Sequence, residues 1–129
     1  MIRAEAAYAA CDASAVGIAA EAVGICSRAG KAHFEARAHG LRALALLRRD
    51  GAAARNANER DFAEMAAPIE RTGATTNAPF LAEWRAELAG VLGDAGTRAQ
   101  LLREAEQGFA AIGAPKQVER LRALLAGGA

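Results

Sequence analysis

The residue types best suited to chemistry occur in the first third of this sequence. The segment 24–32 (GICSRAGKA) places a lysine after the second of two glycines, a composition also found in loops that bind nucleotide phosphates. Such a loop needs four residues between its glycines and a hydroxyl group after the lysine to hold magnesium. Here five residues separate Gly24 from Gly30, and Ala32 follows Lys31. We therefore interpret the segment as a helix end and predict no nucleotide or other cofactor.

The two histidines, His33 and His39, are the natural candidates for metal binding or acid–base catalysis. Six residues apart on a helix, they point in directions that differ by roughly 240°, so one metal ion would not reach both. Glu35 lies four residues before His39, a spacing at which two side chains pair on an exposed helix surface. Neither Ser14 nor Ser27 has the histidine and carboxylate neighbours that a nucleophile needs. We predict no metal site, no catalytic residue and no enzymatic activity.

Charge and cysteine usage narrow the possible partners. The chain carries 16 basic and 15 acidic residues with a net charge of +1, and no basic stripe for a nucleic acid is visible. No run approaches the ~20 apolar residues of a membrane span. Cys11 and Cys26 match no metal or redox spacing, and we expect Cys26 to be a small buried thiol. Reduced thiols without an export signal favour a cytoplasmic protein, with neither nucleic acid nor membrane as partner.

An apolar pattern that ends at a glycine occurs three times. Counting back eleven, eight, seven and four residues from Gly30, Gly73 and Gly113 gives mainly apolar side chains. These offsets lie on one face of a helix, and glycine tolerates the left-handed conformation that ends helices. The positions are Ala19, Ala22, Val23, Cys26, Phe62, Met65, Ala66, Ile69, Leu102, Ala105, Glu106 and Phe109. The glycines are 43 and 40 residues apart, a spacing typical of helical-hairpin repeats.

Apolar periodicity and turn residues predict about seven helices, and the absence of alternating runs makes the fold class all-α. The second predicted helix is capped by Asp12 or Ser14 and runs to residue 28. The other predicted helices cover residues 2–11, 31–49, 52–71, 79–92, 97–112 and 115–126. Asn77 and Thr97 are the expected caps of the helices that follow them. Pro68 is expected to kink or shorten its helix. Phe34 should join the buried seam of the third helix, which continues through Ala38, Leu41 and Ala45.

This order of helices predicts one domain over residues 1–129, built of stacked antiparallel hairpins that form a right-handed α-solenoid. The repeated hairpins are expected over 31–73 and 78–113, and a closing helix over 115–126. The closing helix should pack inward through Val118, Leu121 and Leu125. Because the chain is rich in alanine and only 5% aromatic, we expect its helices to pack closely.

Residues 31–125 resemble tetratricopeptide-type repeats, more weakly before residue 75 and most strongly in the last third of the chain. Residues 88–94 are similar to a first helix that ends in a Gly-Asp turn, 99–113 (AQLLREAEQGFAAIG) to a second helix, and 114–125 (APKQVERLRALL) to a closing helix. The similar arrays are the divergent ones found toward the C-termini of bacterial class III adenylate/guanylate cyclases and of large ATP-dependent transcriptional regulators. Arg85 and Ala86 depart from a regular repeat, which has a large aliphatic and then a small residue there. The resemblance implies a helical array without the cyclase or ATPase catalytic residues.

Two functions of different classes fit this architecture. The first is a non-catalytic scaffold or regulatory module of a bacterial signalling protein, which binds a protein or peptide on the concave face of the array. That face should include Arg37, Arg42, Glu83, Arg85 and Glu87. The alternative is the C-terminal part of a cyclase or ATPase regulator, with an upstream catalytic domain as its partner in cis. An incomplete N-terminal helix pair would leave apolar surface uncovered, which also allows a homodimer.

Overall fold

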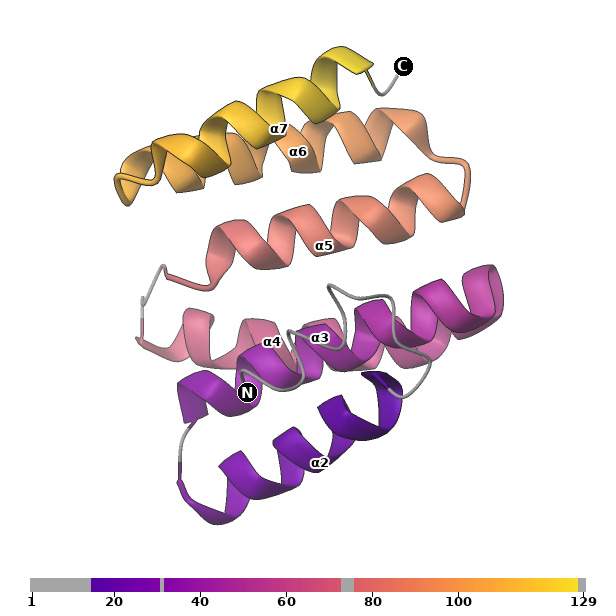
Figure 1. The fold of residues 1–129 in the computed structure, drawn as a ribbon, viewed down its shortest axis with the longest axis vertical. Helices are drawn as coiled ribbons and strands as arrows, with labels where there is room; N and C mark the ends of the chain where they lie inside the picture. Colours follow the sequence, from indigo (N-terminus) through magenta and orange to yellow (C-terminus); the bar gives the residue numbers. More distant parts are fainter. Residues whose placement is uncertain (1–14, 31, 73–75, 128–129) are drawn as a thin grey trace. The chain divides into compact units, whose positions relative to one another are not determined.

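The computed structural model describes residues 15–30, 32–72 and 76–127, and every regular element in these ranges is helical. The elements are α2 (Ala15–Arg28), α3 (Ala32–Asp50), the 3-10 helix η1 (Gly51–Ala54), α4 (Arg55–Thr72), α5 (Ala78–Val91), α6 (Ala95–Ala111) and α7 (Pro115–Gly127) (Figure 1). The predicted all-α class is confirmed, and the described residues form six α-helices and one 3-10 helix, against about seven helices predicted. The helix predicted over 2–11 and Cys11 lie outside these ranges.

The chain divides into two compact units, residues 1–73 and 74–129. The division falls in the connection between α4 and α5, where Gly73 ends the first predicted hairpin. Each unit is described by itself below. The stacking of hairpins into a solenoid stays a prediction.

In the first unit, α3 packs against α2 and against α4 (Figure 1). The side of α2 that is buried consists of Ala15, Ala19, Ala22 and Cys26, at spacings of three and four residues. These positions lie on one face of the helix. The predicted stripe of small side chains is therefore confirmed, except that Val23 is only half-buried. Cys26 is a buried free thiol, as expected.

Larger apolar side chains come from α3 and α4. The buried ones on these two helices are Leu41, Leu44, Leu47, Phe62 and Met65. The prediction for Phe34 was wrong, because its side chain is 47% exposed. Phe34 lies in the first turn of α3, and its ring meets the His33 ring edge-on, with centroids 5.5 Å apart. It therefore takes no part in the seam that Ala38 and Leu41 form.

Pro68 lies inside α4, which nevertheless continues to Thr72. The shortened last turn predicted from this proline was therefore wrong. Proline has no backbone N–H, so the carbonyl oxygen of Glu64 lacks the donor that the residue four positions later normally supplies.

In the second unit, α6 packs against both α5 and α7. Its core consists of side chains from all three helices: Ala86, Leu102, Ala105, Phe109, Val118 and Leu121. The ring of Phe80 meets that of Phe109 edge-on, with centroids 4.9 Å apart. The inward seam predicted for the closing helix is confirmed, since Val118 and Leu121 are buried and Leu125 packs against the core.

The turns that end α5 and α6 share one hydrogen-bond pattern. Gly93 and Gly113 have positive φ angles of 79° and 74°. In each turn the residue after the glycine donates its N–H to a carbonyl five residues earlier. The two bonds, both of 2.9 Å, run from Asp94 to Ala89 and from Ala114 to Phe109. This is the Schellman arrangement, in which glycine ends a helix and reverses the chain.

One of the two predicted N-terminal caps differs in the structure, and the other lacks its side-chain hydrogen bond. Asn77 is the N-cap of α5, but its side chain makes no capping hydrogen bond. Asp94, and not Thr97, caps α6. The Asp94 carboxylate accepts hydrogen bonds from the hydroxyl of Thr97 at 2.7 Å and from its backbone N–H at 3.0 Å. These two bonds hold the pKa of Asp94 below its ordinary value.

Gly108 of α6 lies against Pro79 of α5. A Cβ atom at Gly108 would stand 2.9 Å from Cβ of Pro79 and 3.5 Å from its Cα atom. Because the proline ring cannot rotate away, α6 would have to shift. We expect Gly108→Ala to lower the free energy of unfolding by about 1–3 kcal/mol, although alanine has the higher helix propensity. Urea denaturation followed by circular dichroism measures this change.

Gly96→Ala is the matched control in the same helix. A Cβ atom at Gly96 would meet only the Asp94 Oδ1 atom, at 3.9 Å. This variant should be at least as stable as the wild type, because alanine has less conformational freedom to lose on folding. Equal stabilities of the two variants would contradict the close approach of α5 and α6.

Candidate functional site

A nearly buried carboxylate joins α3 to α4. Asp61 of α4 is 4% exposed. Arg42 of α3 donates from Nε to Asp61 Oδ2 at 3.0 Å and from Nη2 to Oδ1 at 2.5 Å. Nδ1 of His39, also on α3, lies 3.1 Å from the same Oδ1 atom. The carboxylate thus holds two α3 side chains in fixed positions.

The protonation of this cluster follows from its geometry. Burial by itself raises the pKa of Asp61, but the bonds from His39 and Arg42 outweigh burial and hold it below its ordinary value. An ionised carboxylate only accepts hydrogen bonds, so Nδ1 of His39 carries the proton that it donates. The Nε2 atom of His39 lies 4.0 Å from Glu35 Oε1. Glu35 and His39 are close, as predicted, but the His39 side chain is only 12% exposed and does not lie on an exposed surface.

Two open depressions adjoin His39 on the surface of α3 and α4. The larger has a volume of about 460 Å³, and the smaller of about 140 Å³. The larger is lined by His39, Arg42 and Leu46 of α3 and by Ala57, Arg60, Asp61 and Glu64 of α4. The smaller is lined by Glu35, Ala36 and His39 of α3 and by Glu64, Ala67, Pro68 and Arg71 of α4. Because both contain His39 and Glu64, we treat them as one α3–α4 trough.

The α4 wall of this trough carries charges at helical spacing. Arg60, Glu64 and Arg71 are all exposed, and they recur at intervals of four and seven residues, which places them on one side of α4. Within the described ranges, neither Arg60 nor Arg71 makes an ion pair. Glu64 attracts Arg42 through space, which helps to raise the pKa of Arg42, although the hydrogen bond to Asp61 contributes most. The charge of Asp61, at the centre of the trough, is therefore neutralised, whereas Arg60, Glu64 and Arg71 place exposed charges at its rims.

On α3, the structure separates the two arginines predicted to bind a partner. Arg42 belongs to the cluster around Asp61, whereas Arg37 is half-buried five positions earlier. Five residues correspond to roughly 140° around a helix axis. The two side chains therefore lie on different sides of α3, and the joint role predicted for them stays a prediction.

On α5, Glu83 is paired across the second unit. It accepts two hydrogen bonds of 2.6 Å from Arg120 of α7. Arg85 and Glu87 are half-buried on the same helix. Two residues correspond to roughly 200° around a helix, so Arg85 lies across α5 from both Glu83 and Glu87. Glu83 thus contributes to the packing of α7, and a role of the three residues in partner binding also stays a prediction.

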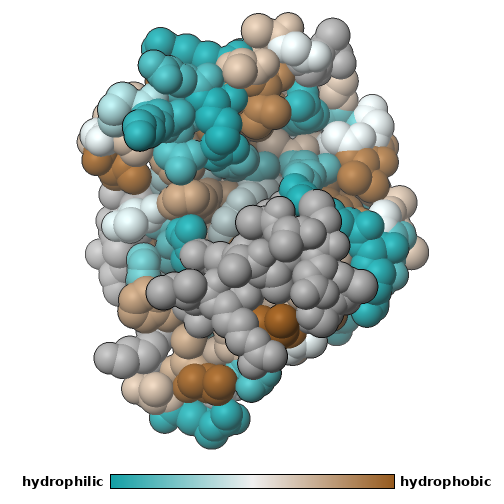
Figure 2. All heavy atoms as spheres, viewed as in Figure 1, coloured by the Kyte–Doolittle hydropathy of each residue, from teal (hydrophilic) through white to brown (hydrophobic). Residues whose placement is uncertain are grey.

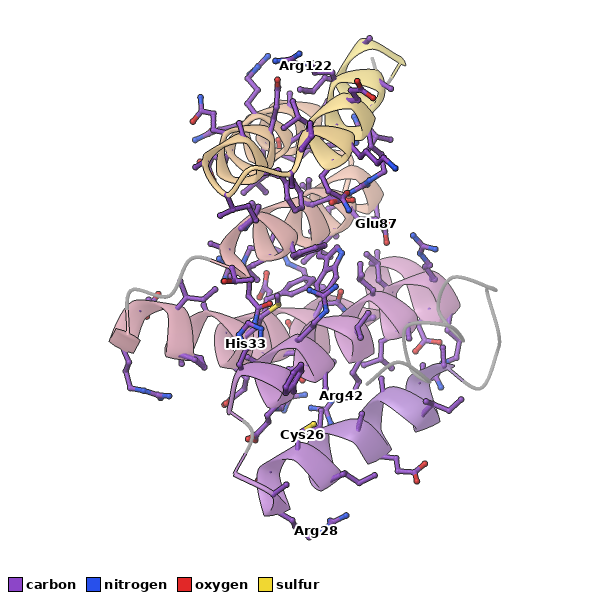
Figure 3. All side chains as sticks on the ribbon, turned by 60° about the vertical axis from the view of Figure 1, so that its left-hand side comes forward. Cys26, Arg28, His33, Arg42, Glu87 and Arg122 are labelled. Carbon is purple, nitrogen blue, oxygen red and sulfur yellow. The ribbon has the colours of Figure 1, made fainter. Side chains whose placement is uncertain are left out.

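The outer surface of the second unit carries further charges and a third depression. Arg122 of α7 donates from Nε to Glu106 Oε1 of α6 at 2.7 Å and lies at the exposed edge of α7 (Figure 3). A depression of about 320 Å³ lies beside it at the turn between α6 and α7. Ala110, Pro115 and Val118 give this depression a largely apolar lining. No charge network comparable to that of Asp61 accompanies it.

Exposed apolar side chains are dispersed. The large ones are Ile25, Phe34, Val91, Leu92, Ile112 and Leu124. On the face shown in Figure 2, hydrophobic residues are scattered among hydrophilic ones. Single exposed apolar residues are common on protein surfaces and do not mark a site.

Sequence reasoning missed Asp61, although a signal for it was present. Asp61 lies four residues before Met65 and directly before Phe62, next to the apolar positions of the glycine-terminated pattern. A carboxylate at the edge of a buried face needs a cationic or hydrogen-bonding partner. The partners, His39 and Arg42, are three residues apart on the preceding helix and face the same way.

No family model, curated protein or solved structure matches this chain. The resemblance to tetratricopeptide-type repeats therefore remains an expectation. In the described ranges, no helix is long and apolar enough to cross a membrane. The same part of the chain holds no group of three or more His, Cys, Asp or Glu side chains placed to bind a metal ion.

Proposed function

We propose that this chain is a non-catalytic, helical protein-binding module, and that the α3–α4 trough receives a segment of its partner. One observation carries this proposal. The exposed side chains of Arg60, Glu64 and Arg71 on the trough form no ion pair with the described residues, whereas the charge of Asp61 beside them is neutralised. A partner that supplied the opposite charges would gain these interactions without breaking an existing pair.

The Asp61 cluster prepares the trough for binding. Three hydrogen bonds from Arg42 to Asp61, and one from His39, join the two helices that form its walls. Side chains that are already ordered lose little conformational freedom when a partner binds. The cluster therefore favours recognition, because the shape of the trough exists before the partner arrives.

The chemistry of the trough is also better suited to binding than to turnover. The linings of its two depressions contain no serine, threonine, cysteine or tyrosine to act as a nucleophile. Asp61 and Arg42 surround one ring nitrogen of His39. The other ring nitrogen lies 4.0 Å from Glu35 Oε1.

The proposal is tested by selecting binding peptides from a random library with the wild-type protein and measuring their affinities for two variants. Arg60→Glu reverses a charge at the rim of the trough without breaking an ion pair. Arg103→Glu makes the same change on an exposed position of α6. We expect the selected peptides to lose about tenfold in affinity with Arg60→Glu, which is about 1.4 kcal/mol. They should bind Arg103→Glu as they bind the wild type.

Two results would overturn the proposal. One is a library from which no peptide is recovered. The other is a set of peptides whose affinities are the same for Arg60→Glu and Arg103→Glu, which would place binding outside the trough.

A further inference from the structure

We infer that the α3–α4 trough recognises an extended segment with one acidic and one basic side chain separated by a single residue. The acidic side chain binds beside Arg60 in the larger depression, and the amine binds in the smaller depression between Glu35 and Glu64. This inference rests on the proposed function and states the chemistry of the partner.

The larger depression offers donors to a carboxylate. The Nε and Nη2 atoms of Arg42 bind Asp61, whereas its Nη1 atom makes no hydrogen bond within the described ranges. The Arg42 side chain is 30% exposed, so Nη1 is available from the trough. The guanidinium of Arg60 lines the same depression. Asp61 is already neutralised by Arg42 and His39, and Glu64, the other carboxylate of this lining, also lines the smaller depression. The cationic donors of the larger depression therefore come from Arg42 and Arg60.

The smaller depression offers acceptors to an ammonium group. Glu35 and Glu64 each contribute a carboxylate to its lining. A lysine ammonium has three donors and no acceptor, so it can bond to both carboxylates together. Arg71 is the one cationic side chain in this lining.

The distance between Arg60 and Glu64 sets the distance between the two charged side chains of a ligand that binds both. Arg60 and Glu64 are four residues apart on α4, which is roughly 6 Å along the helix axis. Two residues of an extended chain cover roughly 6.6 Å and place their side chains on the same face. A segment of the form Glu-x-Lys therefore matches the spacing of the charges in the trough, and the direction in which the segment lies along α4 sets which charge comes first.

The test uses three short alanine-based peptides that contain Glu-Ala-Lys, Glu-Ala-Glu or Lys-Ala-Lys, titrated into the isotopically labelled protein and followed by NMR. We expect the wild type to bind the Glu-Ala-Lys peptide about threefold more tightly than either other peptide, as a partly exposed ion pair allows. Arg60→Glu should prefer the Lys-Ala-Lys peptide, and Glu64→Lys the Glu-Ala-Glu peptide. Arg103→Glu, outside the trough, should keep the wild-type order.

The outcomes separate this inference from the proposed function. Equal binding of the three peptides, or an order that Arg60→Glu leaves unchanged, would overturn the inference. If library-selected peptides still lost affinity with Arg60→Glu, the protein-binding role would stand with a partner of different chemistry. A helical peptide that bound the trough better than the extended one would also overturn the inference and would leave the function in place.

Discussion

Replacing Phe109 with alanine is expected to lower the free energy of unfolding of the second unit by about 3–5 kcal/mol. The Phe109 side chain is 1% exposed and belongs to a core that receives residues from α5, α6 and α7. Its loss would remove the edge-on contact with Phe80 and leave a cavity between three helices. The total stability of a small domain is about 5–15 kcal/mol, so this loss is a large part of it.

Urea denaturation measures this effect, and the fluorescence of Trp84, the only tryptophan, reports on the second unit. Leu124→Ala is the matched control, since it shortens a side chain of α7 that is 38% exposed. We expect the control to change stability by about 0.5 kcal/mol or less. If Phe109→Ala were no more destabilising than Leu124→Ala, the three-helix core described above would be incorrect.

Helix positions in this chain could be predicted because their signals are local. Gly113 ends α6 through its own left-handed conformation, and Pro115 begins α7 through its fixed φ angle. The buried seam of α7 followed from the spacing of Val118 and Leu121 alone. Such signals depend on residues within one or two turns and need no knowledge of the tertiary structure.

The predictions for the cap of α6 and for the burial of Phe34 were wrong for different reasons. Asp94 and Thr97 both suit a helix cap, and the choice of Asp94 depends on where the Gly93 turn directs the chain. Phe34 has the spacing of a core residue but lies in the first turn of its helix, where it remains half exposed. Periodicity shows which residues lie on the apolar face of a helix. It does not show how far along that face a neighbouring helix covers them.

The candidate site could not be assembled from the sequence. Asp61 meets His39 and Arg42 across separations of 22 and 19 residues. Which residues of two adjacent helices face each other depends on their relative rotation. Periodicity places residues on a face of each helix but does not determine how one helix is rotated against the other. The trough could not be predicted from the sequence either, because its charged residues come from two helices.

Replacing Asp61 with asparagine is expected to lower the free energy of unfolding of the first unit by about 2–3 kcal/mol near neutral pH. The amide would keep the shape of the carboxylate but lose the charge that balances Arg42. The amide also has an NH2 group in place of one carboxylate oxygen, and this group cannot accept the hydrogen bonds that Arg42 donates. Hydrogen exchange of the α3 and α4 amides, together with urea denaturation, measures the change.

Acid should reduce the difference between Asp61→Asn and the wild type. The pKa of Asp61 is lower in the folded than in the unfolded chain, so the ionised carboxylate stabilises the fold above its ordinary pKa. That contribution is lost as the pH falls below about 4 and then through the folded-state pKa. Asp50→Asn is the matched control, because Asp50 pairs with Arg49 on an exposed surface and should affect unfolding little. A difference between Asp61→Asn and the wild type that persisted unchanged in acid would show that the charge of Asp61 does not hold α3 to α4.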